Sequence, residues 1–141
     1  MPLFRSASGD AAMVRLETGT DLLEALGEAA AELGMRAGAI QLIGAVSELA
    51  LAYYDQDAAE YRDLRTPGHW EIASGLGNVS LRDGEPFVHV HLVCTGADGH
   101  AVGGHLTAGT TVFMVEAFLQ ALDGEPPVRT RNERIGLDVW H

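Results

Sequence analysis

Cysteine is almost absent from this sequence: Cys94 is the only one among 141 residues. A single thiol excludes an internal disulfide and any thiolate-rich zinc cluster. Because Cys94 stands between Val93 and Thr95, we expect it to be a small buried residue of a strand and not a nucleophile. Any metal site must therefore be built from histidine and carboxylate side chains, and six histidines are available.

Basic residues are also scarce, since nine Lys and Arg stand against 20 Asp and Glu and give a formal net charge of −11. Proteins that bind nucleic-acid backbones usually display a clustered basic face. The only basic cluster here runs from Arg129 to Arg134, in a pattern more typical of a solvated strand or turn. Direct DNA binding is therefore not expected.

Long apolar runs are missing as well, because no segment approaches the ~18 uninterrupted apolar residues of a membrane helix. Residues Met1 to Ser6 show no basic region followed by an apolar stretch, so no secretion signal is predicted. We expect a soluble cytoplasmic protein without a membrane role. The length, the absence of repeats and the 47% apolar content predict a single domain over residues 1–141.

The apolar periodicity predicts an α+β domain with one main helix. Residues 18–21 (Thr-Gly-Thr-Asp) resemble a capping box, and apolar residues then recur at helical spacing from Leu22 to Leu33. Strands are predicted over 39–54 (one long or two short), 70–81 (with a bulge or bend at Gly75 and Gly77), 87–95 and 110–122.

Two histidines share one face of the strand predicted over 87–95. Side chains alternate across a strand, so His89 and His91 point away from Val88, Val90 and Leu92. A hairpin turn at Asp98-Gly99 would bring His105 alongside them.

The spacing contains a conflict, however. A two-residue turn at 98–99 would place His105 opposite Leu92, on the wrong face. We therefore predict an irregularity, either a bulge at Gly103-Gly104 or a loop one residue longer.

Three neutral imidazoles with an open fourth position suit Zn²⁺, at Zn–N distances of about 2.0–2.1 Å, and Ni²⁺, Co²⁺ or Fe²⁺ are chemically compatible. His89, His91 and His105 are thus the predicted metal ligands. The glutamate that follows the His-x-His pair in cupins is absent. We expect His69, His100 and His141 to be solvent-exposed, with His100 the best candidate for an additional ligand.

Several segments together resemble the signature of the PPC (plants and prokaryotes conserved) domain family, and the similarity extends over about residues 12–122. The matching segments are Gly19–Leu23, Ile43–Val46, Gly68–Ile72, Phe87–Leu92, Asp98-Gly99, Val102–Leu106, and Gly109 with Val112 and Glu116.

This resemblance implies an α+β fold on a largely antiparallel sheet, a homotrimer, and three histidines that bind metal in prokaryotic members. Plant members carry Arg-Gly-Arg-Pro hooks for DNA and generally lack these histidines, and this sequence contains no such hook. The segment that binds partners in plant proteins departs here at His69 and Trp70, so no plant partner is carried over.

Three functions remain open. The first is a binding or assembly module, a metal-stabilised trimer that recognises a small molecule or a protein. The second is a zinc enzyme with Glu71 or Glu116 as general acid or base, because each interrupts an apolar strand where a carboxylate is costly to bury. The third is DNA binding, which the family naming favours and the charge opposes.

Overall fold

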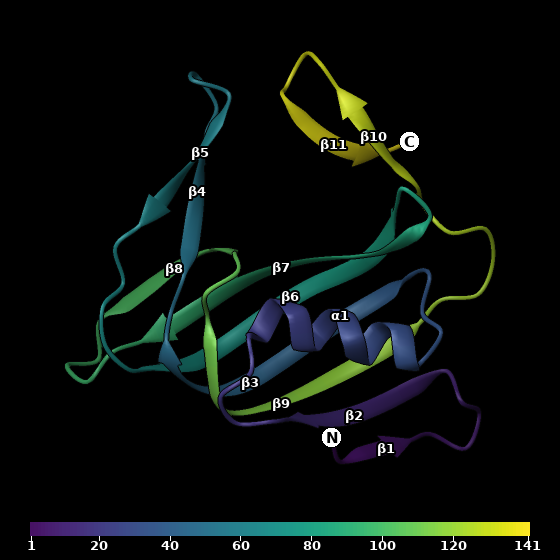
Figure 1. Cartoon of the computed structure of the whole chain (residues 1–141), viewed down its shortest axis with the longest axis horizontal. Helices are drawn as coiled ribbons and strands as arrows, with labels where there is room; N and C mark the ends of the chain where they lie inside the picture. The colour runs from purple at the N-terminus through teal and green to yellow at the C-terminus, as the bar shows by residue number, and fades with distance from the viewer.

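The computed structural model describes residues 1–141, and its dominant element is a nine-stranded sheet that carries one helix (Figure 1). The elements are β1 (Leu3–Arg5), β2 (Ala11–Leu16), α1 (Leu22–Glu32), β3 (Gly38–Glu48), β4 (Leu51–Asp55), β5 (Glu60–Leu64), β6 (Trp70–Arg82), β7 (Glu85–Thr95), β8 (Ala101–Leu106), β9 (Thr111–Ala121), β10 (Arg129–Asn132) and β11 (Leu137–Trp140). The sheet order is β1-β2-β9-β3-β6-β7-β8-β4-β5, all its paired strands are antiparallel, and β10 and β11 form a separate hairpin. The predicted single domain with one helix and a largely antiparallel sheet is confirmed.

Helix α1 begins one turn later than the proposed capping box. Asp21 is the N-cap and accepts a hydrogen bond from the Glu24 backbone N–H at 3.0 Å, whereas the Thr18 hydroxyl donates to the Phe113 carbonyl. The helix ends at Leu33, and Gly34 follows in the left-handed region (φ 66°) that favours glycine. With 11 residues, it is too short to cross a bilayer.

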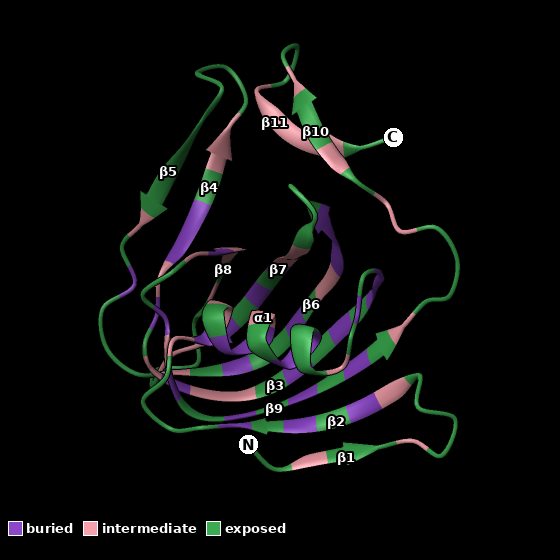
Figure 2. Ribbon diagram, turned by 45° about the vertical axis from the view of Figure 1, so that its right-hand side comes forward, coloured by how far each residue is buried: buried purple, intermediate pink, exposed green.

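The core lies between α1 and one face of the sheet (Figure 2). Leu22, Leu26 and Ala29 of the helix are fully buried, as are Val90 and Leu92 of β7. Burying a leucine side chain contributes about 1.5–3 kcal/mol, so these contacts fix which face of β7 points inward. The odd-numbered residues of β7, including both histidines, must therefore face the other side.

That other side of the sheet is largely apolar and uncovered in one chain. We name its exposed apolar residues, which come from β2, β3, β6, β7 and β9, the apolar sheet face: Met13, Ile43, Leu76, Val93 and Phe118. The residue pairs Met13–Phe118, Phe118–Gln41, Gln41–Leu76 and Leu76–His91 are directly opposed across adjacent strands. One continuous row of side chains thus leads to the histidines.

The strands predicted over 39–54, 70–81, 87–95 and 110–122 are confirmed, with one adjustment in β6. Residues 39–54 form two strands, β3 and β4, and the irregularity in β6 lies between Ile72 and Ser74 instead of at the glycines. No strand was predicted for 60–64, where β5 forms, because its residues are mostly charged and exposed. Pairing with β4 creates this strand, and its own sequence pattern does not indicate it.

Candidate metal centre

A three-residue loop sets the register of the β7–β8 hairpin. The Gly96 N–H donates to the His100 carbonyl at 3.0 Å, and Gly99 adopts a positive φ of 81°. Because the loop spans 97–99, the ladder runs without interruption from Thr95–Ala101 to His91–His105. The longer-loop alternative is therefore confirmed, and the bulge at Gly103-Gly104 does not form.

The hairpin brings the three predicted ligands together. One ring nitrogen from each of His89, His91 and His105 lies within 4.8 Å of the others, and the Nε2 atoms of His89 and His91 are 3.1 Å apart. Ligands of a tetrahedral zinc ion with Zn–N near 2.0–2.1 Å are about 3.3–3.4 Å apart. Small side-chain adjustments are therefore enough to fit such an ion.

One ring nitrogen of His105 has no partner within the chain. Its Nδ1 atom is buried and has no hydrogen-bond partner, although buried polar atoms nearly always have one. A metal ion or a bound molecule would satisfy this nitrogen.

The environment also favours the neutral form of His89 and of His105. Burial lowers the pKa of His89 to about 4, with further contributions from His105, His91 and Arg129. Burial, followed by His91 and Arg129, lowers the pKa of His105 as well. Neutral imidazole is the form that coordinates metal, so these ligands are available at pH 7.

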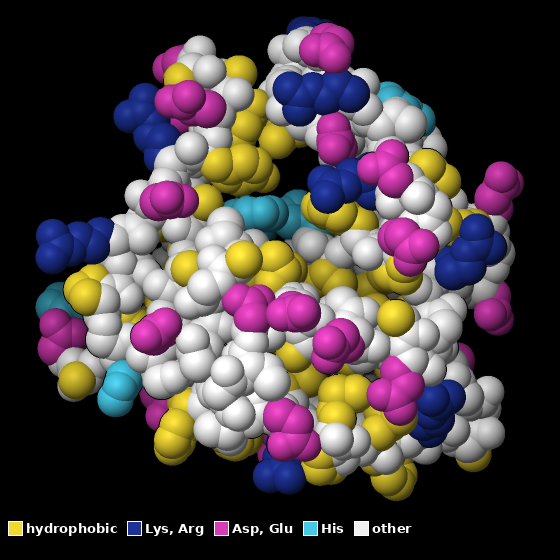
Figure 3. Space-filling view, in the orientation of Figure 1, with side chains coloured by type: hydrophobic (Ala, Val, Ile, Leu, Met, Phe, Trp, Pro, Cys, Tyr) yellow, Lys and Arg dark blue, Asp and Glu magenta, His cyan; other side chains and the backbone are white.

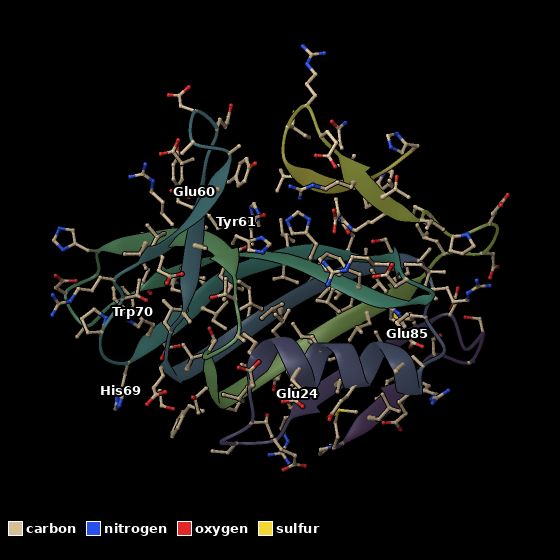
Figure 4. The ribbon with its side chains drawn as sticks, turned by 45° about the horizontal axis from the view of Figure 1, so that its top comes forward. Glu24, Glu60, Tyr61, His69, Trp70 and Glu85 are labelled. Atoms are coloured by element: carbon tan, nitrogen blue, oxygen red, sulfur yellow. The ribbon has the colours of Figure 1, made fainter.

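Two hairpins flank an open cavity of about 400 Å³ next to the histidines (Figure 3). From β5, the Tyr61 ring stacks on His105 with centroids 4.8 Å apart, and Figure 4 shows Tyr61 on the side of β5 that faces the hollow. The neighbouring Tyr54 hydroxyl donates to the Ile135 carbonyl, which ties the β4–β5 hairpin to the β10–β11 hairpin. His89 and His105 therefore form part of the floor of this pocket.

Arg129 fastens the β10–β11 hairpin to the sheet next to the triad. Its Nε donates to Ser80 Oγ at 2.7 Å and its Nη2 to Asn78 Oδ1 at 3.2 Å. The guanidinium carbon lies 4.9 Å from the ring centroids of both Phe87 and Trp140. Arg129 Nη2 also lies 3.5 Å from His89 Nδ1, so the cation borders the metal centre.

The two candidate carboxylates lie elsewhere. Glu71 pairs with Thr95, four residues along β7 from His91, or about 13 Å at strand spacing. Glu116 lies on β9, three strand spacings or about 14 Å from β7. Both side chains are exposed, so the expectation that they interrupt buried strand positions is wrong.

The remaining histidines and the cysteine do not join the site. His100 is exposed and pairs with Asp98 at 2.7 Å, and Figure 4 places His69 well apart from Tyr61. Cys94 is fully buried in β7, as predicted, and burial raises the pKa of its thiol to about 11.

Sequence reasoning missed Tyr61, Asp138 and the position of Arg129 at the site. Arg129 belongs to the basic cluster, which does form a strand and turn, but nothing local shows that this hairpin returns to the histidines. Tyr61 stands in a polar segment without a strand signal. Only the paired elements bring these residues to the cavity.

Comparisons with known proteins agree with this structure. The sequence profile of the Plants and Prokaryotes Conserved (PCC) domain family matches residues 4–123. A metal-containing protein from Archaeoglobus fulgidus is 39% identical, with a TM-score of 0.89, over 100% of this chain and 99% of that chain. A plant- and prokaryote-conserved protein from Pyrococcus horikoshii is 34% identical, with a TM-score of 0.88, and the match covers 99% of this chain and 93% of that chain. No curated protein matches the chain.

Proposed function

This chain belongs to the Plants and Prokaryotes Conserved domain family, and on that basis we propose that it is a metal-binding module which assembles as a homotrimer and recognises a small molecule or protein. The observation that carries the proposal is the cluster of His89, His91 and His105, two of which, His89 and His105, line a cavity. The metal-containing relative from Archaeoglobus fulgidus supports it, since its chain matches along the full length.

The donor set favours Zn²⁺, with Ni²⁺, Co²⁺ and Fe²⁺ as alternatives. Three uncharged nitrogen ligands leave a position for a fourth donor, and the cavity lies on the same side of the sheet. A bound ion would supply positive charge and Lewis acidity to a molecule in the cavity. The histidines would hold the ion, and Tyr61 would restrict the rotation of His105 by stacking on it.

The apolar sheet face supports the homotrimer. Met13, Ile43 and Leu76 are each more than half exposed in one chain, and they line the same surface depression together with Phe118. Contiguous exposed apolar patches on soluble domains mark interaction sites. In the proposed trimer, neighbouring copies cover this face.

The enzyme alternative, with Glu71 or Glu116 as acid or base, requires that carboxylate to come from a neighbouring subunit. Within one chain, Glu71 pairs four residues along β7 from His91, and Glu116 lies three strand spacings from β7. Within one chain, Asp138 is the one carboxylate in the cavity lining.

The DNA-binding alternative is supported by the name of one relative. A protein from Bacteroides thetaiotaomicron is named as a candidate DNA-binding protein. It is 26% identical to this chain, with a TM-score of 0.88, and the match covers 99% of this chain and 96% of that chain. The charge of −11 opposes DNA binding.

Metal analysis of untagged protein, combined with light scattering on the same sample, tests the proposal. We expect one divalent ion per chain and a particle of three chains. Protein that is loaded with zinc, dialysed and found to hold no metal would refute the metal-binding function.

A further inference from the structure

The cavity above the triad carries a local charge opposite to that of the whole protein. Three arginines, Arg82, Arg129 and Arg131, line it together with a single carboxylate, Asp138. Asp138 is shared, since it lies 3.6 Å from Arg82 and 3.9 Å from Arg131. Arg131 also lies 3.9 Å from Glu133, which is outside the lining. With three arginines and one carboxylate in its lining, this is a positively charged pocket in a chain of net charge −11, and the walls of the hollow focus the field of the arginines.

Arg129 forms no salt bridge, although it is partly buried. Its acceptors are Ser80, Asn78, the Asp138 carbonyl and, at the distance limit, His89. A guanidinium has five N–H donors, so at least one remains free.

The rest of the cavity wall is aromatic or aliphatic. Tyr61 and Phe87 stand on the sheet side, and Leu137 and Val139 come from β11. A volume of about 400 Å³ is within the range of pockets for small organic molecules. Figure 3 shows the hollow between the two hairpins, with histidine at its floor and basic side chains on the β10–β11 side.

We propose that this cavity binds a small organic oxyanion, a carboxylate or a phosphate monoester with an apolar or aromatic body. The oxyanion pairs with Arg129 and Arg131, because the planar guanidinium fork matches both groups. The body of the ligand lies against Tyr61 and Phe87. This inference rests on the proposed recognition function and specifies the class of ligand that is recognised. The contacts of the ligand with the arginines do not depend on the metal.

Isothermal titration calorimetry on the zinc-loaded full-length protein tests the inference, with benzoate and phenyl phosphate as anionic probes and benzyl alcohol as the neutral probe. The key variant is Arg131→Gln, which removes a lining charge from an exposed position. Its matched control is Arg134→Gln, which removes the same charge from the same hairpin outside the cavity lining. Metal content is measured for every sample.

We expect at least one anion to bind and benzyl alcohol not to bind. Arg131→Gln should weaken anion binding by about tenfold or more, since one charge-assisted hydrogen bond is worth that factor, and Arg134→Gln should leave it unchanged. Binding of benzoate alone identifies a carboxylate site, and binding of phenyl phosphate alone identifies a phosphate site. The absence of binding by both anions, equal effects of the two variants, or equal binding of benzyl alcohol overturns the inference.

The two proposals fail separately. Protein that keeps its metal but binds neither anion retains the metal function and loses the anion site. Protein that holds no metal but binds an anion in an Arg131-dependent manner retains the anion site and loses the metal function.

Discussion

His91 and His105 are directly opposed across β7 and β8, with ring centroids 5.5 Å apart and planes at 84°. They lie in an uninterrupted ladder, so the backbone positions two of the three candidate ligands before any ion binds. His89, two residues along the same strand, completes the group. A centre built this way should lose its ion when any one imidazole is removed.

The first prediction concerns ligand identity. His91→Ala should abolish stoichiometric metal binding, because two remaining imidazoles hold a divalent ion far more weakly. His141→Ala is the matched control, since it removes an exposed imidazole at the C-terminus and should leave one ion per chain. Elemental analysis measures both variants. Equal metal content in the two would contradict the assignment.

The second prediction concerns pH. His89 has a folded-state pKa of about 4, below its ordinary value of 6.5, so the unfolded chain binds more protons between these pH values. In metal-free protein, the stabilising contribution of neutral His89 is therefore fully present above about pH 6.5 and is lost as the pH falls towards 4. Thermal unfolding with a chelator should show a decline in Tm over this window. The decline should be shallower in His89→Gln, and identical profiles would show that His89 does not contribute.

The third prediction concerns assembly. Light scattering should give about 45 kDa, three chains of 15.0 kDa. Leu76→Glu should dissociate the assembly, because it places a charge in the apolar sheet face, which the proposed trimer buries. Leu122→Glu makes the same change at an exposed leucine after β9 and should preserve it. A wild-type monomer at all concentrations would exclude the trimer.

The fourth prediction concerns DNA. Gel shifts at ~50 mM salt should show no complex with duplex DNA, because a chain of charge −11 gains little from counterion release. A salt-sensitive shift at sub-micromolar protein would be the opposite result. Substituting Arg129, Arg131 and Arg134 would then show whether the basic cluster is responsible.

The fifth prediction concerns the strand that supports the triad. A Cβ at Gly77 would collide with the His89 carbonyl oxygen and the Val90 Cα, so Gly77→Ala should lower the free energy of unfolding by about 1–3 kcal/mol. Gly27→Ala, in α1 with no atom within 4 Å of the new Cβ, should raise it by about 1 kcal/mol. Urea denaturation at fixed protein concentration measures both. A neutral Gly77→Ala would mean that β6 and β7 separate easily.

The sequence by itself determined the helix, the strands with clear apolar alternation and the shared face of His89 and His91. These features depend on local periodicity, which a strand or helix expresses over a few residues. Even the conflict at His105 was visible from the spacing of the turn. The sequence did not decide between a bulge and a longer loop, because either one places His105 on the same face as His89 and His91.

Only the tertiary structure showed that the loop is longer and brought the residues of the cavity together. The three-residue loop depends on hydrogen bonds between Gly96 and both His100 and Gly99. Tyr61 reaches His105 because β5 pairs with β4, and Arg129 reaches His89 because a hairpin some 40 residues downstream lies over β6 and β7. Contacts between residues so far apart in the chain arise from strand pairing and packing, which local sequence patterns do not encode.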